Sequence, residues 1–343
     1  MTKFTDRKVA VITGTAGFIG YHVATQLLQG GWTVIGIDSI SDYYDVGLKK
    51  SREEILSQHP KYRSIHEKIE KPDVCGDVFA AYKPDIVVHL AAQAGVRYSI
   101  ENPRSYLESN IVGTYELLEA ARNFPPSHML LASTSSAYGA SNEMPFKETV
   151  KADHQMSFYA ATKKSTENFA HSYSHLYDLP ITIFRFFTVY GPWGRPDMAL
   201  FKFTQAILDD REIDVYNYGN MTRDFTYVED LATSVTKLID VIPDVSKKTI
   251  SCDSLSPVAP YRVVNIGNSK PTELIEFISQ IEISLGRRAK KNFLPMQPGD
   301  VPMTAACNDL LFELTGYKPD TDVKSGVSKF INWYVNYYGR GNN

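Results

Sequence analysis

Residues 9–20 read VAVITGTAGFIG and join a short apolar run to three glycines. The run Val9–Thr13 is apolar or β-branched throughout, which is typical of a strand buried on both faces. Gly14, Gly17 and Gly20 follow, and a helical apolar pattern begins among them. A strand, a glycine turn and a helix N-terminus form an anion site, because backbone N–H groups and the helix dipole point at a pyrophosphate. The alternative is a strand–helix turn that binds no ligand.

The next apolar run predicts which nucleotide this turn would serve. Residues 32–37 form a second strand pattern that ends in Asp38, 18 residues after Gly20. An acid at this place accepts hydrogen bonds from an adenosine ribose and repels a 2′-phosphate, so the sequence favours NAD over NADP. Lys49 and Arg52 follow in a charged segment, and we expect both on the exposed face of a helix.

The composition excludes several classes of protein. The chain of 343 residues is 43% hydrophobic and carries a net charge of −3, which does not indicate a general binder of nucleic acids or membranes. No apolar run reaches the ~18 residues that span a bilayer. Cys75, Cys252 and Cys307 are scattered without metal-ligand spacing. We therefore expect no metal, reduced thiols and a cytoplasmic location.

Strand and helix patterns alternate along the first half of the chain. This rhythm predicts an α/β fold with a doubly wound parallel sheet of the Rossmann type. Ligands of such sheets lie at the C-terminal ends of the strands. Further strands are expected near residues 63–69, 85–92, 129–133 and 181–187, and helices over residues 104–123 and 158–177.

The texture of the sequence changes after Tyr190. A turn-rich segment opens a second part with three more helical patterns. We expect residues 1–190 to form the nucleotide-binding domain and residues 191–343 a smaller, partly interleaved α/β lobe that binds the substrate. Residues 228–267 are expected to return in part to the first domain.

Tyr159 and Lys163 stand four residues apart in a helical pattern, so they share one face. A nearby cation, helped by the charge of a nicotinamide, lowers the pKa of a tyrosine, and a phenol poised near neutrality is a general base for a substrate hydroxyl. Thr134, Ser135 and Ser136 end the preceding strand and can share the hydrogen bonds of that hydroxyl. The alternative is a surface Tyr–Lys pair and hydroxyls that cap a strand end.

These motifs together resemble the extended short-chain dehydrogenase/reductase family. The resemblance covers nearly the whole chain and is sharpest to its NAD-dependent nucleotide-sugar epimerases, in particular the UDP-glucuronate 4-epimerases. The segments that carry it are TGTAGFIG (13–20), HLAA (89–92), AAQAGVRY (91–98), STSSAYG (133–139), YAATK (159–163), RFFTVYGPWGRPDM (185–198), RDFTY (223–227) and QPGD (297–300).

The resemblance implies roles for individual residues. Those expected to hold NAD, besides the three glycines and Asp38, are Phe18, Ile19, Ser39, Leu90, Ala91, Ala92, Gln93, Asn110, Tyr159, Lys163 and Phe187. Arg223 would bind the diphosphate of a UDP-sugar and Asp300 the uridine ribose. Thr188 and Arg195 would face the sugar carboxylate, with Arg97 nearby; Thr134, Ser136 and Tyr159 would contact the sugar.

The implied reaction is the reversible 4-epimerisation of UDP-glucuronate to UDP-galacturonate, through a 4-keto intermediate and transient NADH. Related decarboxylases and dehydratases carry acids beside the active hydroxyl, whereas this chain has Ser135-Ser136. The alternatives are a UDP-glucuronate decarboxylase, a 4-epimerase of a neutral UDP-hexose and, more remotely, a non-catalytic NAD-binding regulator. A homodimer is implied, formed by the helices at 104–123 and 158–177.

One departure from the family pattern concerns the adenine. The family carries an Asp followed by an apolar residue after the third strand. Alignment backward from the fourth strand places Lys68-Ile69 there, and Asp73-Val74 fits only if the intervening segment is shortened. The residue that contacts the adenine is therefore left open.

Overall fold

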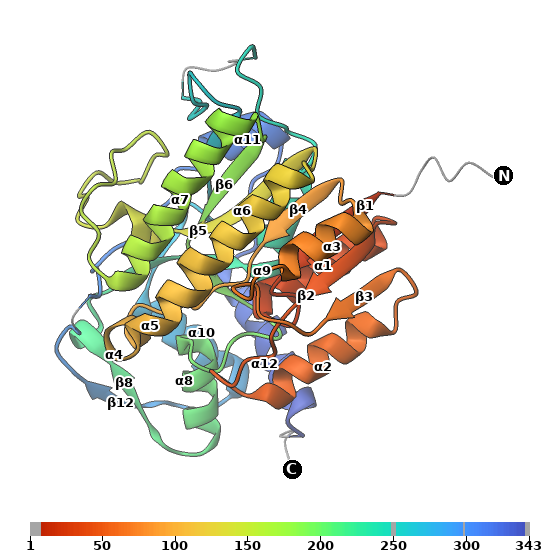
Figure 1. Cartoon of the computed structure of the whole chain (residues 1–343). Coiled ribbons are helices and arrows are strands. Elements are labelled where there is room, and N and C mark those ends of the chain that lie inside the picture. Colours follow the sequence, from red (N-terminus) through yellow and green to blue (C-terminus); the bar gives the residue numbers. More distant parts are fainter. Residues whose placement is uncertain (1–7, 248–251, 298, 340–343) are drawn as a thin grey trace.

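The computed structural model describes residues 8–247, 252–297 and 299–339 (Figure 1). Its centre is a sheet of seven parallel strands, β1 (Val9–Thr13), β2 (Thr33–Ile37), β3 (Tyr62–Ile65), β4 (Ile86–His89), β5 (His128–Thr134), β6 (Ile181–Phe186) and β10 (Tyr261–Ile266). The order across the sheet is β10-β6-β5-β4-β1-β2-β3. The chain reverses its direction of travel between β1 and β4, and ligands of doubly wound sheets bind at such a point.

Helices cover both faces of this sheet. On one face lie α1 (Phe18–Gln29), α9 (Val228–Leu238) and α11 (Asp309–Thr315), which bury Leu27, Leu231 and Leu310 against it. On the other face lie α3 (Val74–Tyr82), α6 (Gly113–Asn123) and α7 (Phe158–Tyr177), seen side by side in Figure 1. All residues of β1, β2 and β4 are buried, as apolar strands between two helix layers require. The predicted α/β fold is confirmed.

A smaller lobe packs below the C-terminal ends of the strands. It contains the three-stranded sheet of β7 (Thr188–Tyr190), β9 (Thr222–Tyr227) and β11 (Pro271–Glu273), the pair β8 (Glu212–Val215) and β12 (Lys290–Phe293), and the helices α8 (Ala199–Leu208), α10 (Leu274–Leu285) and α12 (Val323–Tyr337). Its core is aromatic, and the rings of Phe225 and Phe277 stack with centroids 3.9 Å apart. Two elements from residues 228–266 belong to the larger domain, although this range lies between parts of the smaller lobe in sequence. β10 pairs with the edge of the seven-stranded sheet, and α9 packs on one of its faces.

Three elements differ from the sequence expectation. β4 ends at His89 instead of continuing to residue 92. β3 ends at Ile65 instead of continuing to residue 69, because the chain turns inward there and buries Ile69 against the core. The helix expected over residues 104–123 is divided into α5 (Pro103–Tyr106), a π-helical turn (Leu107–Val112) and α6. π turns are rare and concentrate at functional sites. This one places Asn110 in the interior.

The expected exposure of Lys49 and Arg52 is wrong. Both lie on α2 (Val46–Ser57), yet only 5% of Lys49 and none of Arg52 is exposed. Each cation is buried because it finds oxygen acceptors inside. The Lys49 ammonium donates to the carbonyl and the hydroxyl of Ser41, and the Arg52 guanidinium donates to backbone carbonyls.

A buried ion pair fastens α7 to the sheet. Glu167 on α7 receives two hydrogen bonds from Arg185 on β6, 2.9 and 2.8 Å long, and one from Ser133 on β5, 2.6 Å long. Lys164 donates to the same carboxylate. Burial by itself would raise the pKa of Glu167, but the charge and hydrogen bonds of Arg185 outweigh it and lower the pKa to about 2.

The substitution Glu167→Gln is expected to lower the free energy of unfolding by about 3–5 kcal/mol, because it leaves the Arg185 guanidinium buried without its counter-charge. Since the folded-state pKa lies below the ordinary 4.5, the carboxylate stabilises the fold above that pH, and this contribution is lost as the pH falls toward 2. Urea titrations at several pH values measure both effects.

Glu67→Gln is the matched control, because the Glu67–Lys71 pair lies on the surface and such pairs contribute less than about 1 kcal/mol. Equal losses in the two variants would contradict the assigned role of Glu167.

Candidate active site

The glycine turn lies at the switch point of the sheet. Gly14 has φ +80°, and a Cβ on it would lie 2.8 Å from the backbone nitrogen of Ala91, so only glycine fits between β1 and the end of β4. α1 begins after Gly17 with no side chain capping its first turn, which leaves N–H groups of Phe18 and Ile19 to face an anion. This arrangement fits the pyrophosphate of a dinucleotide.

Asp38 stands beside this turn at the end of β2. Its two carboxylate oxygens accept the backbone N–H groups of Ala16, at 3.0 Å, and Ile40, at 2.8 Å. Burial raises the pKa of this carboxyl, and the hydrogen bond from Ile40, the charge of Lys49 and the hydrogen bond from Ala16 oppose that shift. Ser39 follows at the start of a loop. The acid therefore lies where a ribose bound at the turn would meet it.

The segment after β4 forms the floor beside the turn. Thr13 accepts the backbone N–H groups of Leu90 and Ala91 on its hydroxyl, at 3.1 and 3.0 Å, and Ala92 follows. Asn110 accepts the N–H of Gln93 at 2.8 Å and donates to its carbonyl at 3.1 Å. Its amide also donates to Thr162 on α7 at 3.0 Å. Asn110 thus holds this segment against α7.

Tyr159 and Lys163 lie in the first two turns of α7, which begins with the Ser157 side chain accepting the N–H of Ala160. Burial raises the pKa of Tyr159, and a hydrogen bond with Thr134 and the charge of Arg195 act against the rise. In the protein alone the pKa of Tyr159 is thus raised, whereas the expected lowering included the charge of a nicotinamide ring. Burial also lowers the pKa of Lys163, to about 8, despite the charge of Glu167.

The hydroxyl cluster ends β5 opposite Tyr159. The Thr134 hydroxyl accepts the N–H of Ser136 at 3.1 Å and so opens a single 3₁₀ turn, Ser135–Tyr138. The structure thus brings Tyr159 and Thr134 together, with Ser135 and Ser136 on the same turn. Hydroxyls, rather than carboxylates, are the side chains at the start of this turn.

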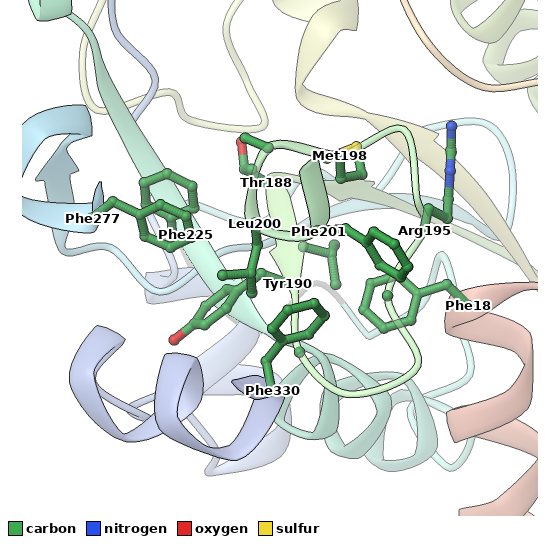
Figure 2. Close-up of a pocket in the computed structure, with 14 residues that line it drawn as sticks. Phe18, Thr188, Tyr190, Arg195, Met198, Leu200, Phe201, Phe225, Phe277 and Phe330 are labelled. Carbon is green, nitrogen blue, oxygen red and sulfur yellow. The ribbon is translucent and has the colours of Figure 1, made fainter. Parts of the chain in front are cut away.

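A pocket lies in the smaller lobe and reaches Phe18 at the start of α1 (Figure 2). Thr188 and Arg195 both line this pocket. The side chain of Arg195 points away from the aromatic rings that line the remainder of the pocket. Phe187, which precedes Thr188, is buried and packs near Phe146. Arg195 forms two hydrogen bonds with Asp197. Its charge is therefore partly balanced within the protein.

A second group of charges lies near the loop that follows β12. Arg97 donates to Asp300 at 3.0 Å, and its guanidinium lies 4.7 Å from the ring centroid of Tyr216. Arg223 donates to the carbonyls of Thr222 and Pro302. Burial and the charge of Arg97 lower the pKa of Arg223, and Asp300 raises it. Arg97 therefore lies with Arg223 and Asp300.

The sequence reasoning missed three residues of this region. Asp197 binds Arg195, the hydroxyl of Tyr43 donates to Asp197 at 3.4 Å, and Arg52 contacts the turn before Arg195. The ion pair of Arg195 with Asp197 could have been predicted, because an acid stands two residues after the arginine. The other two contacts join residues more than a hundred positions apart, which no local pattern reveals.

The described residues form neither a metal site nor a membrane-spanning helix. Within residues 8–247, 252–297 and 299–339, no group of three or more His, Cys, Asp or Glu side chains is placed to hold a metal ion. No helix in the part of the chain that the structure describes is both long and apolar enough to cross a membrane.

Known proteins resemble this chain over most of its length. Residues 10–252 match the NAD dependent epimerase/dehydratase family. A probable UDP-glucuronate 4-epimerase of Rhizobium meliloti is 50% identical over 96% of this chain and 98% of its own. UDP-glucuronate 4-epimerase 4 of Arabidopsis thaliana is 42% identical over 96% of this chain and 75% of its own.

A solved structure agrees with these sequences. The UDP-glucuronic acid 4-epimerase of Bacillus cereus, in complex with UDP-glucuronic acid and NAD, superposes with a TM-score of 0.86 at 31% identity, covering 96% of this chain and all of its own. Its bound NAD agrees with the cofactor that the glycine turn and Asp38 predict here. The chain therefore belongs to the NAD dependent epimerase/dehydratase family.

Proposed function

We propose that this protein is an NAD-dependent UDP-glucuronate 4-epimerase that interconverts UDP-glucuronate and UDP-galacturonate. The observation that carries the proposal is the meeting of Tyr159 with Thr134 beside two serines, at the end of β5. This group can move a proton on a sugar hydroxyl. It holds no acid for a further proton transfer, which favours inversion over loss of the carboxylate. The similarity to UDP-glucuronate 4-epimerases supports the same substrate.

Each residue of this group has its own role in the epimerisation. Bound NAD supplies the hydride acceptor and donor at C4 of the sugar. Tyr159 takes the proton from O4, and Thr134 and Ser136 hold the oxygen by hydrogen bonds. Lys163 lies one helical turn behind Tyr159, where its ammonium orients the cofactor and stabilises the phenolate. The protein thus contributes position and charge, and the same phenol returns the proton after the ring has turned.

The sugar carboxylate is assigned to Thr188 and Arg195. A ketone at C4 makes the carboxylate on C5 that of a β-keto acid, which loses CO₂ readily when the breaking bond aligns with the carbonyl π system. Thr188 offers a hydroxyl, and Arg195 offers a charge-assisted contact. Holding the carboxylate out of that alignment would preserve it through the turn of the ring. Arg223 is assigned to the diphosphate and Asp300 to the uridine ribose.

We further propose a homodimer through the layer that contains α6 and α7. Apolar side chains stand exposed along these helices, with Tyr115 48% and Leu176 64% exposed. Phe169 on α7 and Leu107 in the π-helical turn extend the patch. A contiguous apolar face on two adjacent helices is typical of a protein interface, and a two-fold pairing of the same face would cover it in both copies.

Incubation with UDP-glucuronate and no added cofactor is the test of the activity. We expect UDP-galacturonate to appear, and we expect Tyr159→Phe to lose about 10²–10⁴-fold in turnover, because it keeps the ring and removes the base. Separation of the products by anion exchange measures both. Binding of UDP, followed by calorimetry, should change little in the variant. A variant that keeps most of its turnover would show that the base lies elsewhere, with Thr134 the next residue to examine.

Thr188→Val is expected to slow epimerisation and to release some UDP-4-keto-pentose, because the carboxylate loses a hydrogen bond that restrains it. Product separation together with the absorbance of NADH detects the abortive turnovers. Thr204→Val is the matched control, since Thr204 is buried on α8 within the same lobe but lies outside the pocket lining. The role of Thr188 is wrong if both variants epimerise normally without pentose, and Arg195→Ala is then the next variant to test.

Leu176→Glu is expected to shift the protein from dimer to monomer, because it places a charge in the apolar face. Light scattering after gel filtration measures the mass. Ile283→Glu is the matched control, since Ile283 on α10 has the same 64% exposure but lies in the smaller lobe. A wild-type protein that is monomeric at micromolar concentration would refute the interface.

A further inference from the structure

Arg52 is a fully buried cation whose contacts join two parts of the site. One terminal nitrogen donates to the carbonyl of Ala16, at 2.8 Å, and to the hydroxyl of Tyr44, at 2.9 Å. The other donates to the carbonyl of Trp193 at 2.6 Å and more weakly to that of Gly194 at 3.5 Å. Its Nε–H is buried and meets no acceptor among the described residues. The contacts of this guanidinium thus all run through its two terminal nitrogens.

The first contact belongs to the cofactor side of the site. Ala16 lies in the glycine turn, and its N–H donates to Asp38, the residue that faces the adenosine ribose. The carbonyl of Ala16 accepts a hydrogen bond from Arg52. Ala16 is therefore held through both of its backbone polar groups, its N–H by an acid and its carbonyl by a cation.

The second contact belongs to the sugar side. Trp193 has φ +62°, an unusual value for a residue with a side chain, and its ring packs against Tyr21 and Trp333. His22 bonds the carbonyl of Pro192 at 3.0 Å. Burial lowers the pKa of His22 to about 4, so the ring is neutral and its Nε2 carries the proton that it donates. Three successive carbonyls are thereby fixed immediately before Arg195.

A return contact closes this path into a ring. Arg195 binds Asp197, and Asp197 accepts from Tyr43. Tyr43 and Tyr44 are adjacent in the loop that follows Asp38, and Tyr44 is itself a partner of Arg52. The loop that follows Asp38 and the segment that carries Arg195 are therefore joined by two sets of contacts. Tyr44 reaches Trp193 through Arg52, and Tyr43 donates to Asp197.

We propose that Arg52 is a positioning residue that couples the NAD site to the pocket of the sugar carboxylate. This inference rests on the proposed function. Because one planar guanidinium holds Ala16 and the Trp193–Gly194 peptide together, it fixes the distance between the glycine turn that would hold the pyrophosphate of the cofactor and the groups that restrain the uronate. Coupling of this kind is reciprocal, so NAD should tighten the uronate site and UDP-glucuronate should tighten NAD.

Arg52→Lys tests the coupling, because lysine keeps the charge but cannot present a planar fork to both carbonyls. We expect the variant to release NAD during gel filtration, to raise the KM for UDP-glucuronate and to increase the fraction of turnovers that end in 4-keto-pentose. Misplacement by about 1 Å can cost about 100-fold, and we expect a change of at least about tenfold in KM or in that fraction. NAD in the denatured protein is quantified by chromatography.

Arg262→Lys is the matched control. Arg262 lies on the far strand β10, is also buried and forms two hydrogen bonds with Asp253. It should lower the melting temperature without changing NAD retention or the product ratio. Tyr44→Phe removes a single partner of Arg52 and should give a weaker effect in the same direction, in a protein whose packing is unchanged. The double variant of Arg52→Lys and Arg195→Ala should be less than additive, because both act on one path.

The inference is overturned if Arg52→Lys and Tyr44→Phe retain NAD, KM and the product ratio of the wild type. If Arg52→Lys fails to fold, Tyr44→Phe decides by the same readouts. A wild-type protein that does not epimerise UDP-glucuronate would refute the proposed function instead. NAD retention with and without UDP-glucuronate would then still decide the coupling, because its measurement requires no turnover.

Discussion

The site depends on a buried carboxylate whose charge must be balanced inside the protein. Glu167 receives hydrogen bonds from β5 and β6 and thereby sets the height of α7 against the sheet. Tyr159 and Lys163 stand eight and four residues before Glu167, so the same helical face carries all three. The phenol reaches Thr134 because this helix cannot slide without leaving Arg185 unpaired. A structural ion pair thus fixes the position of Tyr159 relative to Thr134.

The electrostatics of the pair Tyr159 and Lys163 show what the protein does not provide by itself. Burial raises the pKa of the phenol and lowers that of the ammonium, so both groups are biased toward their neutral forms. A phenolate requires further positive charge close by, and the oxidised nicotinamide ring carries such a charge. A nicotinamide ring bound beside Tyr159 would therefore make the basicity of the phenol depend on the oxidation state of the cofactor.

The sequence predicted the sheet well because its signals are local. Continuous apolar runs such as Val9–Thr13 mark buried parallel strands, and the glycines of the first turn have a direct steric cause at Gly14. Lys49 and Arg52 were misjudged because charge indicates exposure only when no acceptor waits inside, and their acceptors come from loops. The contact of Arg97 with Asp300 was not predicted, because the two residues lie 203 positions apart in the sequence. Such pairings depend on the folded chain, and no periodicity predicts them.

The π-helical turn between α5 and α6 has a consequence for comparing this chain with others. A π turn holds one residue more than the α turn it replaces, so the residues after it are rotated by about 100° relative to an unbroken helix. Leu107 at the start of the turn is exposed, whereas Leu118 in α6 is buried, although an unbroken helix would place both on the same face. Relatives that lack the extra residue would need a one-position gap here. An ungapped alignment would leave the residues on one side of the turn one position out of register with their counterparts.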